Sequence, residues 1–136
     1  MKIFIGCSKY FYSRVNEIKS FLEAKGHEIT LPNCFDNPFE EEQVRKVGAE
    51  EHMRWKCKMM KTHGSNIKKQ DAILILNFEK NGIPNYIGGA TFMEVIKAWE
   101  FGKKIFFYNP LPNCSFTDEL KGMSLLVINE NLDLIK

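Results

Sequence analysis

Five short runs of apolar and β-branched residues recur along the chain, and longer amphipathic stretches separate most of them. Their length is that of β-strands, and they cover Lys2–Cys7, His27–Leu31, Ala72–Phe78, Lys104–Asn109 and Ser124–Ile128. The third run reads Ala-Ile-Leu-Ile-Leu-Asn-Phe, and such an apolar run is typical of a central strand covered on both faces. The pattern therefore predicts a parallel sheet with a buried centre.

The stretches between these runs predict four helices, over Tyr12–Lys25, Glu40 to about His63, Thr91–Phe101 and Thr117–Lys121. Apolar residues of the first recur close to the helical period, with Ser13 as the expected N-cap and Gly26 as the expected stop. The second is long and polar, and Gly48 predicts a break within it. Gly102 ends the third.

Strands that alternate with helices predict an α/β fold, a five-stranded parallel sheet of the flavodoxin-like or Rossmann-like kind with helices on both faces. No internal linker or repeat is present, so we expect one domain over residues 1–136. Ligands of such sheets bind at the carboxyl ends of the strands. This rule places one cleft beside Gly6-Cys7-Ser8, Asn77-Phe78, Gly88-Gly89 and Asn109.

Composition argues against several classes of function. The 19 Lys+Arg residues nearly balance the 17 Asp+Glu residues, so a net charge of +2 gives no reason to expect a nucleic-acid partner. The four cysteines form no CxxC pair and have no histidine at ligand spacing, so we expect neither a metal site nor disulfides. No apolar stretch approaches membrane-span length, and the chain starts directly in a strand, so we expect no membrane partner and a cytoplasmic location.

The segment from Gly88 to Glu94 has two interpretations. In the structural one, Thr91 caps the following helix and Glu94 completes a capping box, while the glycines form a tight turn. In the functional one, the free N–H groups of the helix start bind an anion, and their positive potential keeps Glu94 ionised. An ionised Glu94 that faces the cleft could attack an electrophilic carbon and form a covalent intermediate. The sequence leaves both interpretations open.

A resemblance to a known family is carried by Asp71–Asn77, Gly88–Glu94, Ala98 and Gly102–Ile105. These residues resemble the nucleoside 2-deoxyribosyltransferase superfamily, which includes the 2′-deoxynucleoside 5′-phosphate N-hydrolases, and the resemblance covers about residues 2–8 and 63–110. It implies a flavodoxin-like fold, a homodimer or larger homo-oligomer, a nucleoside or nucleotide substrate, and no metal or organic cofactor. The family's glutamate attacks C1′ of the deoxyribose and displaces the base, and the motif aligns it with Glu94.

Three positions differ from the family pattern. Phe4 stands where the family usually has a tyrosine that holds the nucleophile, and Gly88 stands where the transferases have an aspartate and the hydrolases a serine. His63 replaces an aspartate that contacts the nucleoside and assists at the base. A histidine titrates near neutrality and could serve there as acid or base, or it could simply be the polar end of the long helix.

Two hypotheses about function follow. The first is an enzyme that cleaves an N-glycosidic bond or transfers a deoxyribosyl group, with Glu94 and His63 as its catalytic residues. The substrate-binding residues expected for it are Gly6, Cys7, Ser8, Asn77, Gly88, Gly89 and Thr91. The second hypothesis is a binding module for a nucleotide or phosphorylated metabolite that has lost catalysis, because Phe4, His63 and Gly88 replace polar family residues.

Overall fold

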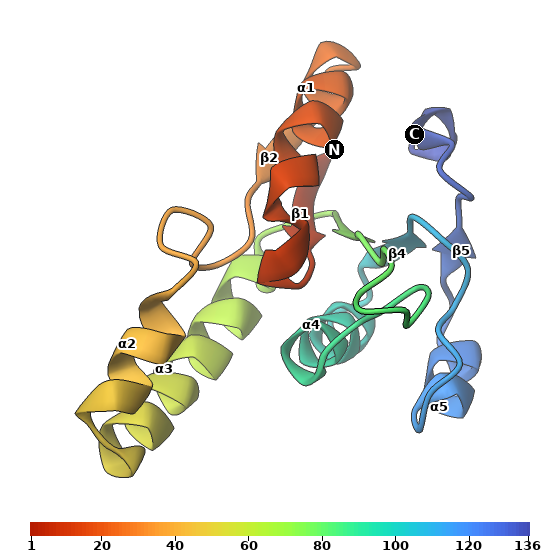
Figure 1. Ribbon diagram of the computed structural model, residues 1–136. Coiled ribbons are helices and arrows are strands. Elements are labelled where there is room, and N and C mark those ends of the chain that lie inside the picture. The colour runs from red at the N-terminus through yellow and green to blue at the C-terminus, as the bar shows by residue number, and fades with distance from the viewer.

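The computed structural model describes residues 1–136 and contains one sheet of five parallel strands in the order β2-β1-β3-β4-β5 (Figure 1). The strands are β1 (Lys2–Gly6), β2 (Glu28–Thr30), β3 (Ala72–Ile75), β4 (Lys104–Phe107) and β5 (Leu126–Val127). Each of the four adjacent pairs is parallel, and β3 is buried at all four positions. The predicted five-stranded parallel sheet is confirmed, and of the two kinds of sheet that the pattern left open, the observed order is the flavodoxin-like one.

Helices cover both faces of this sheet, as predicted. They are η1 (Lys9–Arg14), α1 (Val15–Ala24), α2 (Glu40–Val47), α3 (Ala49–Lys68), α4 (Gly89–Glu100), α5 (Thr117–Gly122) and η2 (Leu132–Leu134). None of them is both long and apolar enough to cross a membrane.

Alternate residues of the strands feed two separate apolar cores. Ile3 and Ile5 of β1 pack with α1 residues such as Leu22 on one face, whereas Phe4 packs with Ile67 of α3 on the other. Because successive strand side chains point to opposite faces, one short strand anchors helices on both sides. The core that contains Phe4 also contains Val95 of α4 (Gly89–Glu100). Packing in this core therefore fixes the position of β1 relative to α4.

The long polar stretch folds as two helices rather than one. Gly48 separates α2 from α3, which confirms the expected break, but α3 continues to Lys68. The prediction that His63 ends the helix is therefore wrong, and His63 lies buried inside α3. Figure 1 shows the α2–α3 pair extending away from the sheet, and α2 has no buried residue.

The chain enters its first helix differently from the prediction. A 3₁₀ helix occupies Lys9–Arg14 and continues directly into α1, so Ser13 lies inside a helical turn and is not an N-cap. Phe11, buried in this turn, packs edge-on against Phe78. Burial of an aromatic side chain thus decides the local path of the chain. The end of α1 is as predicted, since Gly26 has a φ of +88° just beyond it.

Asn77 joins the segments that follow β3 and β4. Its side chain is fully buried, and its Nδ2 donates to the carbonyl oxygens of Asn109 and Pro110 at 3.1 and 2.8 Å. Its Oδ1 accepts from the Asn109 backbone N–H at 2.8 Å. These contacts use both ends of the amide, so the structure gives Asn77 a structural role.

Replacing Asn77 with alanine should lower the free energy of unfolding by about 3 kcal/mol, because several buried groups of the two loops lose their partners. Urea unfolding measures the change. Asn16→Ala, at an exposed position on α1, is the matched control and should change stability by less than about 0.5 kcal/mol. Equal stability of the Asn77→Ala and Asn16→Ala variants would contradict this role.

Candidate active site

A cavity of about 410 Å³ lies beyond the carboxyl ends of β1 and β2, between them and the start of α4. The α2–α3 pair forms its outer wall. Of the residues expected to bind or act on substrate, the structure brings seven to this cavity: Cys7, Ser8, His63, Gly88, Gly89, Thr91 and Glu94. Gly6 and Asn77 are not part of its lining, and neither is Asn109.

Gly6 nevertheless determines where Glu94 can lie. A Cβ atom on Gly6 would stand 2.5 Å from Oε2 of Glu94 and 3.1 Å from Cδ1 of Ile75. The carboxyl group of Glu94 therefore packs directly on the backbone at the end of β1, where only glycine leaves room for it. The contribution of Gly6 to the site is this space.

The predicted capping box is absent. Helix α4 begins at Gly89 with Gly88 as its N-cap, and no side chain caps it. Thr91 is buried in the first turn of α4. Glu94 lies in the second turn of this helix, whereas a capping box would place it in the first. Two successive glycines allow the helix to start before Thr91, and this leaves the first N–H groups of α4 without intrahelical partners. The carboxylate of Glu94 is thus not used for capping.

Glu94 and His63 face each other across the interior of the site. Glu94 is only 5% exposed, and its Oε1 lies 3.3 Å from Nδ1 of His63, although the angle is not that of a hydrogen bond. Burial raises the pKa of Glu94 well above its usual range. Burial, aided by the charge of Lys56, lowers the pKa of His63. Both groups therefore favour their neutral forms, contrary to the expectation that the start of α4 keeps Glu94 ionised.

Polar atoms without partners gather at this cavity. Six buried side-chain nitrogen or oxygen atoms make no hydrogen bond, and five of them belong to residues that line the cavity. These five are Asn33 Nδ2, Glu42 Oε2, Trp55 Nε1, His63 Nδ1 and Glu94 Oε2. Each buried group of this kind costs about 1–3 kcal/mol if nothing satisfies it. Their concentration in one place indicates a site that a polar ligand completes.

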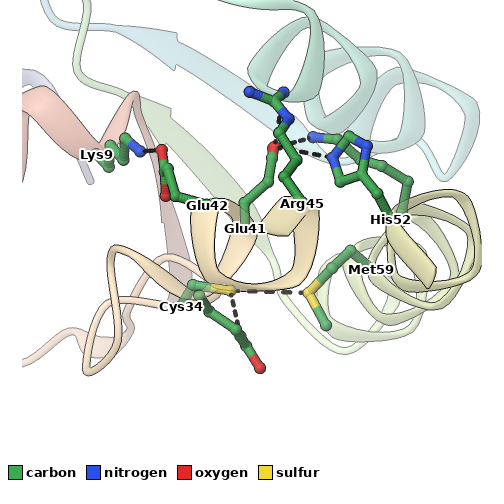
Figure 2. A network of polar contacts seen from close by, with 9 residues as sticks. Lys9, Cys34, Glu41, Glu42, Arg45, His52 and Met59 are labelled. Atoms are coloured by element: carbon green, nitrogen blue, oxygen red, sulfur yellow. Dashed lines mark hydrogen bonds and ion pairs between the residues drawn. The ribbon is translucent and has the colours of Figure 1, made fainter. Parts of the chain in front are cut away.

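Most charged groups of the cavity wall are already paired. Figure 2 shows Lys9 joined to Glu42, and it shows Glu41 facing both Arg45 and His52. Lys56 also reaches Glu41, with 2.7 Å between Nζ and Oε1. These pairs link η1 to α2 and α2 to α3 across the site.

Lys80 is the exception among the cations of the cavity. It has no carboxylate partner, and its Nζ lies over the rings of Tyr10 and Tyr86 at 4.2 and 4.5 Å. Tyr86 in turn lies beside Gly88, because its hydroxyl would be 3.2 Å from a Cβ atom there. The ammonium group of Lys80 donates to the Tyr86 hydroxyl at 3.5 Å and pairs with no carboxylate, and it stands next to the uncapped start of α4. Sequence reasoning missed Lys80, which lies in an irregular loop and matches no motif.

The cysteine of the cavity is not an activated thiol. Burial, and to a lesser extent the charge of Glu94, raises the pKa of Cys7 far above its usual range. Cys34, on the opposite wall, has its pKa raised to about 11 by burial and by its hydrogen bond to Glu40. Glu94 is therefore the stronger candidate for the nucleophile.

Comparison with known proteins supports the fold through structural similarity at low sequence identity. No family model matches the sequence, and no curated protein is similar to it. Among solved structures, the chain is similar to the Clostridium botulinum CMP N-glycosidase BcmB. The TM-score is 0.54 at 18% sequence identity, and the match covers 95% of this chain and 90% of that one. The two proteins share an α/β fold over nearly their whole lengths.

The Glu94→Gln variant should be more stable than the wild type at pH 8. An acid whose pKa is raised by folding contributes fully to stability below its unfolded pKa near 4.5, and this contribution is lost as pH rises through the folded pKa. The neutral amide avoids that loss, so the gain should exceed about 0.5 kcal/mol at pH 8 and shrink towards pH 4. Urea unfolding at both pH values measures it.

Glu100→Gln is the control for this measurement, since Glu100 is exposed at the end of α4 and pairs with Lys97. It should be neutral or slightly destabilising at pH 8. A Glu94→Gln variant that is less stable than the wild type at pH 8 would show that the carboxyl group is ionised and well solvated in the folded protein.

Proposed function

We propose that this protein cleaves the N-glycosidic bond of a nucleotide, with Glu94 as the nucleophile. The observation that carries the proposal is a buried carboxyl group with one oxygen free of hydrogen bonds, at the wall of a ligand-sized cavity. The resemblance to the nucleoside 2-deoxyribosyltransferase superfamily supports it at the same residue. So does the shared fold of a protein whose name states that it is a CMP N-glycosidase.

The first step of the proposed reaction generates the nucleophile. The proton of Glu94 passes to Nδ1 of His63, 3.3 Å away, and leaves a carboxylate and an imidazolium. Substrate binding favours this transfer, because an electrophilic C1′ beside the carboxylate stabilises the charge that burial otherwise disfavours. The pair thus holds its proton until a substrate is present.

The second step breaks the bond to the base. An oxygen of Glu94 attacks C1′, the C1′–N bond breaks, and its electron pair leaves with the base, which takes a proton from Nε2 of His63. Water then attacks C1′ of the resulting ester and gives a proton to Nε2 of His63, and the bond from C1′ to the Glu94 oxygen breaks. The sugar phosphate leaves, and the Nδ1 proton of His63 returns to the carboxylate of Glu94. If another base takes the place of water, the same intermediate yields deoxyribosyl transfer.

A phosphate group on the substrate fits the end of the cavity beside α4. The first N–H groups of α4 carry positive potential and have no cap, and the ammonium group of Lys80 is unpaired nearby. Both features favour a dianion. We therefore propose a nucleoside 5′-monophosphate rather than a nucleoside, in a protein that works as a homodimer or larger oligomer as the family resemblance implies.

A second candidate function is a nucleotide-binding module without turnover, and two observations favour it. Phe4, where the family usually has a tyrosine, is fully buried in the core and has no hydroxyl to orient Glu94. The nearby hydroxyl of Tyr12 already donates to the backbone oxygen of Asn33. Binding without hydrolysis would favour this second candidate.

A mechanism-based trap tests the nucleophile. Incubation with 2′-deoxy-2′-fluoro nucleoside 5′-monophosphates should give a covalent adduct, because the fluorine slows hydrolysis of the ester more than its formation. Peptide mass spectrometry should place the adduct on Glu94. Glu94→Gln should form no adduct and lose at least about 10³-fold in kcat, whereas Glu100→Gln should behave as the wild type. Turnover retained by Glu94→Gln would overturn the proposal.

The phosphate subsite makes a separate prediction. Lys80→Met should lower kcat/KM for the nucleotide by about tenfold to a hundredfold and leave that for the matching nucleoside almost unchanged, because only the nucleotide loses a charge-assisted contact. Steady-state kinetics on both substrates measures the split. Lys121→Met, on α5 away from the cavity, is the control. An equal effect of Lys80→Met on both substrates would contradict the subsite.

A further inference from the structure

We propose that Asn33 selects the base of the substrate by donating a hydrogen bond from Nδ2, an inference that rests on the proposed binding of a nucleotide in this cavity. Asn33 lies just beyond β2 and lines the cavity. Neither the family motif nor the periodicity of the sequence singles it out.

Two hydrogen bonds fix Asn33 and leave one donor unused. The hydroxyl of Tyr12 donates to its backbone oxygen at 2.9 Å, and Nδ2 of Asn66 donates to its Oδ1 at 2.8 Å. In this hydrogen-bond pattern, Oδ1 faces the donor from α3 and Nδ2 lies on the other side of the amide. Nδ2 is buried and has no partner. A side chain held this firmly with a free donor is a preorganised recognition group.

The order of the strands places Asn33 at the end of the cavity where the base should lie. β1 lies between β2 and β3, and the carboxyl group of Glu94 packs on Gly6 at the end of β1. Asn33 follows β2 on one side, whereas Lys80 and the start of α4 follow β3 on the other. C1′ lies between the phosphate and the base of a nucleotide. With C1′ at Glu94 and the phosphate at Lys80, the base extends towards Asn33.

The wall around Asn33 suits a flat, partly apolar ring. Pro32, Cys34 and Met59 line this part of the cavity. The sulfur atoms of Cys34 and Met59 lie 3.8 Å apart, and Figure 2 shows them facing each other. Trp55, also in the lining, contributes a second buried donor without a partner, its Nε1. Two unpartnered donors of this kind suit the carbonyl oxygens and ring nitrogens of a base.

The test compares ligands that differ only in the base. Calorimetric titrations on the Glu94→Gln background, which prevents turnover, use CMP, UMP, AMP and GMP, their 2′-deoxy forms, and ribose 5-phosphate with its 2-deoxy form. Asn33→Asp keeps the acceptor for Asn66 and removes the donor. It should weaken the tightest nucleotide about tenfold or more, the effect of one buried hydrogen bond, and leave the sugar phosphate unchanged.

The sugar phosphate arm separates base recognition from other effects of the variant. Charge repulsion, a contact to the sugar or a distorted cavity would weaken nucleotide and sugar phosphate alike, and that result would overturn the inference. So would an unchanged nucleotide affinity. Asn37→Asp, exposed in the same loop and outside the lining, is the matched control and should change neither affinity. If Asn33→Asp does not fold, Asn33→Ser removes the same donor.

Failure of the inference and failure of the proposed function remain distinguishable. A nucleotide that binds no tighter than its sugar phosphate overturns the role of Asn33 but leaves hydrolysis by Glu94 intact. If the protein with Glu94 in place turns over none of the nucleotides yet binds one of them through Asn33, the inference holds for a binding module. Binding of none of the ligands overturns both.

Discussion

The carboxyl group of Glu94 rests on the backbone of Gly6, and the remaining geometry of the site depends on this contact. It requires β1 beside β3 in the middle of the sheet, with α4 packed on the same face as Phe4. It also requires a residue without a side chain at the end of β1. The sheet thus supplies rigidity, while a single missing Cβ supplies the space in which a reactive group can lie.

This arrangement is costly for the folded protein and useful for chemistry. An acid buried against backbone and a neutral imidazole holds its proton, and five unpartnered polar atoms surround the same cavity. A fold selected only for stability would satisfy or remove such atoms. Their concentration around one cavity that Lys80 also lines, a cation with no carboxylate partner, is the strongest physical argument that a charged, polar ligand belongs there.

The regular part of the fold could be predicted from sequence because periodicity reports burial directly. The apolar run that became β3 and the glycine that ends α1 are examples, and the parallel pairing of the strands follows from their alternation with helices. The start of α4 could not be predicted, since Thr91 and Glu94 match a capping box in sequence. Two preceding glycines let the helix begin earlier, and only the structure shows which start is used.

The candidate site was predicted in part for a related reason. A motif placed Glu94, and its burial and its contact with Gly6 came only from three-dimensional packing. Asn77 follows the carboxyl end of β3, where cleft residues were expected, yet it ties two loops together. Asn33 and Lys80 lie in loops without periodicity. Their importance comes from a missing partner, a hydrogen-bond acceptor for Nδ2 of Asn33 and a carboxylate for Lys80. A missing partner cannot be predicted from the sequence, because it depends on which residues the fold brings close.

A crystal structure of the Glu94→Gln variant with its tightest-binding nucleoside 5′-monophosphate would show directly whether Glu94 is placed to attack C1′. We expect C1′ within about 3.5 Å of the side-chain oxygen of residue 94, the distance of a reactive pair. We also expect the phosphate at Lys80 and the start of α4, with the base against Asn33. A nucleotide bound with C1′ remote from residue 94, or bound outside this cavity, would contradict the proposal.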